Sequence, residues 1–409
     1  MRILRALGKV RLVWETDPRK NPNPLVYGIL VVAAILYPLL AQVVTGGEGD
    51  FLISLVADGG VYILLAIGLN VVVGFAGLLD LGYAAFFAIG AYTYAFLASD
   101  HLVVTPLHEA VHLPFWIVLF VGLFVAAAFG LILGAPTLRL RGDYLAIVTL
   151  GFGEIVPRVF KNVSVWTSGV NGISALDKPV LPVWLQGPWS GDPLELVRNF
   201  KIISPMAFYV VMVLLLAICV VLVNNLRQSR VGRAWMAVRE DEVAAAAMGV
   251  NTVRIKLLAF SIGAAFSGFA GSFYGAKLSL VSPENFGFTV SITILVMIVL
   301  GGMGNIPGVI VGSILIYLVI FQFLNALPPL AEGWATSLGL GGLVPENGDW
   351  PGISQEVQRL KFLIFGIILV LTMLLRPQGL IPSRVRQQEL TKGVHDEQTI
   401  EDLNAETTA

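Results

Sequence analysis

The chain has 409 residues, of which 56% are hydrophobic and only 13% are charged. Soluble domains carry about 25% charged residues, so this composition excludes an ordinary soluble protein and indicates a polytopic membrane protein. The formal net charge is −1, and the basic residues gather in a few loops, which signals membrane orientation and not nucleic-acid binding. The single cysteine, Cys219, lies in an apolar run, so an internal disulfide is excluded and a buried small hydrophobe is expected.

The first segment, residues 1–24, is basic and is predicted to lie in the cytoplasm, because Lys and Arg are retained on that side. Ten apolar runs of about 17–25 residues follow, each long enough at 1.5 Å per residue to cross roughly 30 Å of hydrocarbon. They predict an all-α polytopic membrane protein with about ten transmembrane helices. The predicted spans are 25–45, 51–73, 77–99, 115–138, 143–160, 206–226, 256–278, 286–302, 306–326 and 360–376.

The loop charges agree with a simple alternation of these spans. Loops predicted inside carry arginine clusters, whereas three loops predicted outside carry no Lys or Arg: 46–50, 100–114 and 279–285. The exception is the large outer loop, 161–205, which holds Lys and Arg. Long loops cross the membrane with less dependence on their charge, so this loop is still predicted outside. Its tryptophans suit either the membrane interface or contact with an external partner. Both termini are therefore predicted to be cytoplasmic.

Composition divides the chain into the segment 1–24, a transmembrane domain at 25–380, and a polar, acidic tail at 381–409. The tail is predicted to be cytoplasmic and disordered. No segment outside the predicted spans is large enough for a catalytic domain, and the sequence has no GxxxxGK[ST] phosphate-binding motif. Any ATP hydrolysis that drives this protein is therefore expected on another polypeptide.

Glycines form two patterns. The turns at 73–77 and 300–304 resemble each other and are both predicted at the cytoplasmic side. This echo indicates either a duplicated unit or the glycine turns that are common between spans. Small residues in 82–91 and 263–275 predict close helix packing, with the lining of a pathway as the alternative.

Few ionisable residues fall inside the predicted spans, where a charge costs roughly 2.5–3.5 kcal/mol on insertion scales. Asp58 and Lys277 lie near predicted outer ends and are expected to reach water. Asp80 lies in a glycine turn near the inner face, where hydration is expected. Glu154 lies deepest and stands four residues before Arg158, which is the favourable order for a helical salt bridge.

The span with Glu154 is the candidate translocation path, because it also places polar or flexible residues at Thr149, Gly151 and Gly153. The alternative is that Glu154 only forms a structural salt bridge. Buried acids and histidines are otherwise scarce, which argues against a proton-driven carrier. The sequence has no metal-ligand spacing and no nucleophile constellation, so no metal, cofactor or catalytic residue is expected on this chain.

A charged, alanine-rich loop at 227–256 interrupts the membrane pattern. Its middle, 231–248, is predicted to form a short helix that offers small side chains to a soluble partner, with glycine turns at both ends. The residues expected to couple this loop to the partner are Gly232, Arg233, Arg239, Glu240, Asp241, Glu242, Ala244, Ala245 and Gly249. The alternative is an amphipathic helix on the inner leaflet, although three consecutive acidic residues argue against an anionic surface.

Four blocks of the sequence resemble the second-type permease of the branched-chain amino acid ABC importers, in the same order and across more than half of the chain. The blocks are GFAGLLDLGYAAFFAIGAYTYA, RGDYLAIVTLGFGEI, VGRAWMAVREDEVAAAAMGVNTVRIKLLAFSI and VLGGMGNIPGVIVG. The resemblance implies a type II ABC importer permease fold with ten spans. It implies as partners a second permease subunit, expected to be a paralogue, two P-loop ATPase subunits that bind ATP and Mg, and an external substrate-binding protein. It also places the coupling helix within 231–249.

The sequence departs from the family pattern in two places. The loop motif of importers, Glu-Ala-Ala followed by Gly, is Val243-Ala244-Ala245 here, with Glu242 as the nearest acid. Asp80 and Tyr83 stand where the family often has Ser and His.

The resemblance implies a non-catalytic transport subunit of a prokaryotic cell (inner) membrane that imports leucine, isoleucine and valine. Uptake of urea, short amides or other amino acids is the alternative within the same class. An ion-coupled secondary carrier and a membrane enzyme are the alternatives from other classes.

Overall fold

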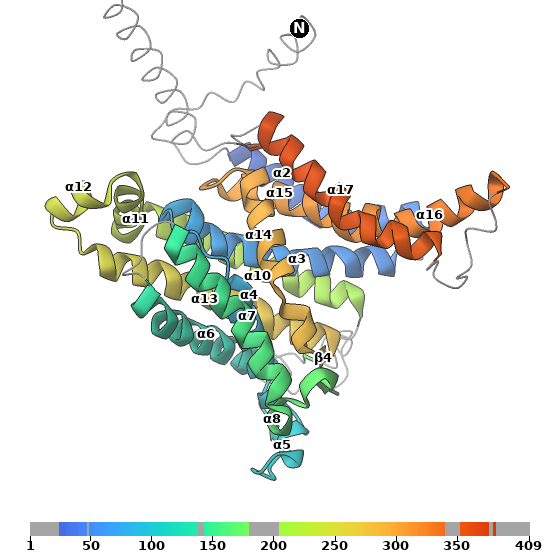
Figure 1. The fold of residues 1–409 in the computed structure, drawn as a ribbon, viewed down its shortest axis with the longest axis horizontal. Coiled ribbons are helices and arrows are strands. Elements are labelled where there is room, and N and C mark those ends of the chain that lie inside the picture. The colour runs from blue at the N-terminus through green and yellow to red at the C-terminus, as the bar shows by residue number, and fades with distance from the viewer. Residues whose placement is uncertain are drawn as a thin grey trace, which may run out of the picture. The chain divides into compact units, whose positions relative to one another are not determined.

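The computed structural model describes residues 24–46, 49–137, 143–179, 204–339, 352–375 and 379–381. These residues are almost wholly helical, and their strands are limited to two short antiparallel pairs (Figure 1). The predicted all-α membrane fold is therefore confirmed. Internal contacts divide the chain into two units, residues 1–53 and 54–409.

Each of the ten predicted spans overlaps a helix of the structure. Seven stretches of the described residues are long and apolar enough to cross a membrane, so the count of ten stays a prediction. The helices that overlap the first five predicted spans are α2 (Pro24–Val44), α3 (Asp50–Asn70), α4 (Tyr83–Leu97), α6 (Phe115–Thr137) and α7 (Asp143–Asn162). Those that overlap the last five are α10 (Pro205–Gln228), α13 (Thr252–Leu278), α14 (Phe288–Gly301), α15 (Ile306–Leu318) and α17 (Ile353–Leu375). The π-helix η1 (Val71–Phe75) continues α3, and the π-helix η5 (Val319–Phe323) and α16 (Leu324–Ser337) continue α15.

The N-terminal unit consists of α2 and the first turn of α3. Inside it, the Tyr37 hydroxyl donates to the carbonyl of Leu52 at 3.0 Å. Gly49 lies so close to Ala41 that an added Cβ would stand 2.9 Å from the backbone carbon of that residue. The start of α3 therefore packs closely against α2.

The larger unit is built around α13, which packs against α4 and α6 (Figure 1). Glycines bring these helices into backbone contact, because a Cβ on Gly90 of α4 would stand 2.1 Å from the carbonyl oxygen of Gly268. The Ser272 hydroxyl adds a bond of 3.1 Å to the carbonyl of Gly90. The prediction that these small residues serve helix packing is confirmed.

The predicted span 77–99 is wrong at its start. The helix formed by α3 and η1 ends at Phe75, Gly77 adopts φ +70°, and α4 begins only at Tyr83. Residues 71–82, here called the hinge segment, thus pass from a π-turn through a non-helical stretch into α4. Sequence hydrophobicity does not reveal this break, because the stretch is as apolar as a span.

The two glycine turns of the sequence echo contact each other, together with residues 379–381. The Asn70 side-chain oxygen accepts from the backbone N–H of Gly304 at 2.9 Å. The N–H groups of Leu380 and Ile381 donate to the carbonyls of Leu300 and Gly301, at 2.7 and 3.1 Å. These contacts are called the glycine junction below. They do not decide between duplication and ordinary glycine turns.

Three of the loops predicted outside, 100–114, the described part of 161–205, and 279–285, come together at the other end of the unit, around α5 (His101–Val104) and α8 (Ser164–Thr167) (Figure 1). There β1 (Ala98–Ser99) pairs with β2 (Val111–His112), and β3 (Ile173–Ser174) pairs with β4 (Leu280–Val281). Because β3 belongs to the large loop and β4 to the lysine-free loop, these loops lie on one side. The described part of the large loop, 161–179, therefore shares a side with the loop 279–285, and the assignment of that side to the outside stays a prediction.

Candidate functional site

The charged loop folds as two helices, not as the single helix predicted over 231–248. They are α11 (Arg230–Glu240) and α12 (Glu242–Ala247), and the extended Asp241 separates them. The Asp241 carboxylate accepts from the N–H groups of Val243 and Ala244, at 2.8 and 3.0 Å, and so caps α12. An aspartate is a poor helix-interior residue because it caps so well, which is the sequence signal for this break.

Of the two glycine turns predicted at the ends of the helix pair, the one at Gly249 is confirmed, whereas Gly232 lies inside the first turn of α11. Gly232 is buried against the end of α10, where an added Cβ would stand 2.3 Å from the carbonyl oxygen of Arg227. Gly249 adopts φ +86°, and the N–H of Val250 bonds back to the carbonyl of Ala245 at 3.1 Å. A glycine in this left-handed conformation is a common helix end.

The outward surface of α12 is small and apolar. Val243 is 69% exposed and Met248 is 85% exposed, with Ala244, Ala246 and Ala247 exposed beside them. Of the predicted coupling residues, the exposed ones are Arg233, Glu240, Asp241, Ala244 and Gly249. An alanine-rich turn flanked by two large apolar side chains is suited to entering a groove on another protein.

Three predicted coupling residues face inward instead. Glu242 contacts the Lys256 ammonium at 2.6 Å, and that lysine side chain is 8% exposed. Ala245 is buried, and the Arg239 guanidinium donates to the carbonyl of Gly74 at 2.6 Å. In this structure Arg239 and Glu242 therefore bind within the chain and do not offer their charges to a partner. Sequence alone assigns them to the loop but not to either face of it.

The hinge segment lies between Arg239 and α7. On one side, a Cβ on Gly77 would stand 2.7 Å from Cγ of Arg239. On the other, the N–H of Leu81 donates to the Thr149 hydroxyl at 3.1 Å. A Cβ on Gly82 would stand 2.1 Å from the carbonyl oxygen of Thr149, so the hinge segment and α7 touch backbone to backbone.

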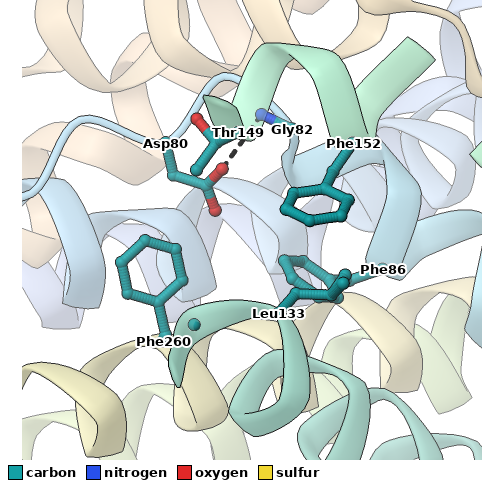
Figure 2. Close-up of a pocket in the computed structure, with 8 residues that line it drawn as sticks. Asp80, Gly82, Phe86, Leu133, Thr149, Phe152 and Phe260 are labelled. Atoms are coloured by element: carbon teal, nitrogen blue, oxygen red, sulfur yellow. Dashed lines mark hydrogen bonds between the residues drawn. The ribbon is translucent and has the colours of Figure 1, made fainter. Parts of the chain in front are cut away.

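A pocket opens where the hinge segment meets α7 and α13, and Figure 2 shows the carboxylate of Asp80 beside it. Asp80 is 1% exposed and accepts from the N–H of Gly82 at 2.9 Å. The expectation that Asp80 is hydrated is wrong, because aromatic rings and α7 cover it. The pocket is lined by Asp80, Gly82, Phe86, Leu133, Gly134, Thr149, Phe152 and Phe260.

The predicted path residues occupy two faces of α7. Thr149 and Gly153 are buried against the hinge segment, and Gly151 has nothing near its α-carbon within 4 Å. Glu154 and Arg158 form the expected salt bridge at 3.2 Å, with side chains that are 43% and 74% exposed. The salt bridge is thus confirmed, while a role of these residues in a path stays a prediction.

Asp58 and Lys277 do not reach water separately as expected but bind each other. Their charged atoms are 2.5 Å apart, and the lysine also donates to the carbonyl of Ser54 at 2.7 Å. A salt bridge between α3 and α13 satisfies both charges within the protein. The sequence indicated this salt bridge only by placing two opposite charges near the predicted outer ends of their spans.

Within the described ranges, no group of three or more His, Cys, Asp or Glu side chains is arranged to hold a metal ion. Helices that suit a membrane, together with a helix pair on a charged loop, define a multi-pass membrane protein of the transport-permease class.

The chain belongs to the family of branched-chain amino acid transport system permease components, whose family model matches residues 51–373. It is 38% identical over 375 residues to the high-affinity branched-chain amino acid transport system permease protein LivM of Escherichia coli (strain K12), covering 89% of this chain and 76% of that protein.

Two further relatives are more distant. The chain is 26% identical over 263 residues to the permease protein LivH of Salmonella typhimurium, covering 63% of this chain and 80% of LivH. It is 28% identical over 284 residues to the permease protein BraD of Pseudomonas aeruginosa, covering 69% of this chain and 85% of BraD. No solved structure gives a significant match. The resemblance drawn from the sequence blocks is confirmed.

Proposed function

We propose that this chain is the transmembrane permease subunit of an ATP-driven ABC importer for leucine, isoleucine and valine. The observation that carries the proposal is the similarity to LivM, which extends over 89% of the chain. An external protein captures the amino acid, and this chain and a second permease form the path. ATP and Mg bind to two partner ATPases, so this chain catalyses no covalent step.

The partner ATPase docks on α12. The exposed Val243 and Met248 supply apolar contact, and the exposed Glu240 and Asp241 supply polar contacts at the edge. The alternative, a helix lying on the inner leaflet, is disfavoured because α12 has only six residues and begins with acidic side chains that an anionic surface would repel.

The second permease covers the outward face of α7. Glu154 and Arg158 lie exposed on this helix, and charged groups at membrane depth face protein or water and not lipid. A paralogue is the partner favoured by the comparisons, because the chain resembles both LivM and LivH. The protein lies in a prokaryotic cell membrane. Both termini are in the cytoplasm, because the arginine-rich loops between the spans lie on that side.

The proposal is tested by purifying the tagged chain from native membranes in mild detergent and identifying its partners by mass spectrometry. Two P-loop ATPases and a second permease are expected, and the reconstituted complex should import leucine only with ATP and the external binding protein. Uptake of urea but not leucine would indicate instead a permease for urea or short amides, the alternative within the same class. Leucine uptake that persists without ATP, by a chain that purifies alone, would contradict the proposal.

The docking surface has a separate test. Gly249→Leu should distort the end of α12, because a leucine is strained at φ +86°. Uptake should fall while the membrane helices remain folded. A matched Gly333→Leu change alters a glycine of α16 that also has open space around it, and it should have no effect on ATPase binding. Equal ATPase binding by both variants would count against docking on α12.

A further inference from the structure

A continuous series of contacts connects the cytoplasmic helix pair to α7. It starts at α12, passes through Arg239 of α11 and the hinge segment 71–82, and ends at Thr149. We propose that Arg239 is the residue that transmits movement of the helix pair to the hinge segment and, through it, to α7. This inference rests on the proposed ATP-driven import and names the route by which the partner acts.

The first step is that α11 and α12 move together. Asp241 joins them as the cap of α12, and Trp235 of α11 is fully buried. The indole N–H of Trp235 donates to the carbonyl of Ile255 at 2.7 Å, and the salt bridge of Glu242 with Lys256 holds the next turn. Ile255 and Lys256 both lie at the start of α13, so α11 and α12 are fixed to the same turn of that helix, and a push on the exposed surface of α12 is passed to α11 through it and through Asp241.

The second step is the contact of Arg239 with the hinge segment. Its guanidinium binds the carbonyl of Gly74 where the helix is about to end, so it satisfies a backbone acceptor that the helix leaves open. Its aliphatic stem lies directly over Gly77, which has no side chain to hold it away. Charge-assisted bonding and steric contact thus act on one short segment from the same side.

The third step is the contact of the hinge segment with α7. Leu81 donates to Thr149, and Gly82 lies against the carbonyl of the same residue and near Gly153. Because Gly82 meets the carbonyl of Thr149 backbone to backbone, and Leu81 bonds to the side chain of the same residue, the hinge segment cannot shift toward α7 without moving it. The segment itself is non-helical between Phe75 and Tyr83, so it can rotate without breaking a helix.

An alternative role for Arg239 is a static anchor of the loop. The two roles differ in what is lost on substitution, because a static anchor affects assembly and ATP hydrolysis together with import. A transmitting residue affects import per ATP hydrolysed and leaves ATPase binding intact. The comparison needs the complete complex with its native partners, reconstituted in liposomes and supplied with ATP and the leucine-loaded external binding protein.

In this system, Arg239→Ala should lower leucine import about tenfold while ATP hydrolysis stays within about twofold of the unaltered complex. Arg239→Lys should recover part of the import, because lysine keeps the stem and one donor. The matched control is Arg230→Ala, an exposed arginine at the start of the same helix, which should change neither rate. Thr149→Val removes the acceptor for Leu81 at the far end of the route and should also lower import per ATP.

Import by Arg239→Ala at the unaltered rate would overturn the inference. So would a parallel loss of import and ATP hydrolysis, because that result is the signature of a static anchor. If Arg239→Ala fails to assemble, Thr149→Val decides, and unchanged import per ATP would then overturn the route. Failure of the unaltered complex to couple import to ATP would instead refute the proposed function itself.

Discussion

The close contact between α4 and α13 leads to a quantitative prediction for Gly90. A Cβ at this position would lie 2.1 Å from the carbonyl oxygen of Gly268, whereas ordinary contacts begin at 3.4 Å. The helices α4 and α13 would have to separate by about 1.3 Å, the difference of these distances, because the neighbouring atoms are backbone and cannot rotate away. Forced separation of a packed interface costs about 1–3 kcal/mol.

Gly90→Ala should therefore lower the thermal unfolding midpoint of the purified protein in mild detergent by about 1–4 °C, measured by tryptophan fluorescence. Gly151→Ala is the matched control, because nothing lies within 4 Å of its added Cβ. Alanine also has the higher helix propensity, so this control should be as stable as the original or slightly more stable. An unchanged midpoint for Gly90→Ala, or an equal fall in both variants, would refute the reasoning.

Three further outcomes are expected. The pKa of His112 is raised by its hydrogen bonds to Asp177 and Asp100. The charged histidine therefore stabilises the loops that hold these residues fully below its ordinary pKa of 6.5, and this stability is lost as pH rises through the higher pKa of the folded state. Thermal unfolding midpoints measured across a pH series should show the loss, and His112→Gln should abolish this pH dependence. Asp241→Ala should cost α12 about 1 kcal/mol and weaken ATPase co-purification, while Asp241→Ser should not. Glu154→Gln should reduce leucine flux with the complex intact, and unchanged flux would remove Glu154 from the path.

Much of the architecture could be predicted because the membrane imposes long apolar runs, and each predicted span overlaps a helix. The glycines before Tyr83 predict a turn there, but the start of α4 at Tyr83 could not be predicted, since Leu78, Leu79 and Leu81 extend the apolar run. Packing against α7 and Arg239 decides that conformation, and neither neighbour is close in sequence.

The candidate site was predicted as a set of residues but not as a geometry. The charged loop, its glycine turn at Gly249 and the salt bridge of Glu154 follow from local patterns in the sequence. The inward direction of Arg239 and Glu242 depends on partners at Gly74 and Lys256. Lys256 lies within the same loop as Glu242, whereas Gly74 is far from Arg239 in sequence, so no local sequence pattern could predict the contact of Arg239 with Gly74.

The glycine junction has a consequence for the order of biosynthesis. Leu380 and Ile381 bind the carbonyls of Leu300 and Gly301, and the Asn305 side chain donates to the carbonyl of Ile381 at 2.8 Å. These partners leave the ribosome some 75 residues before residues 380–381 do. Every earlier helix can therefore enter the bilayer while this turn is still open, and translation of the last helix becomes the event that closes it.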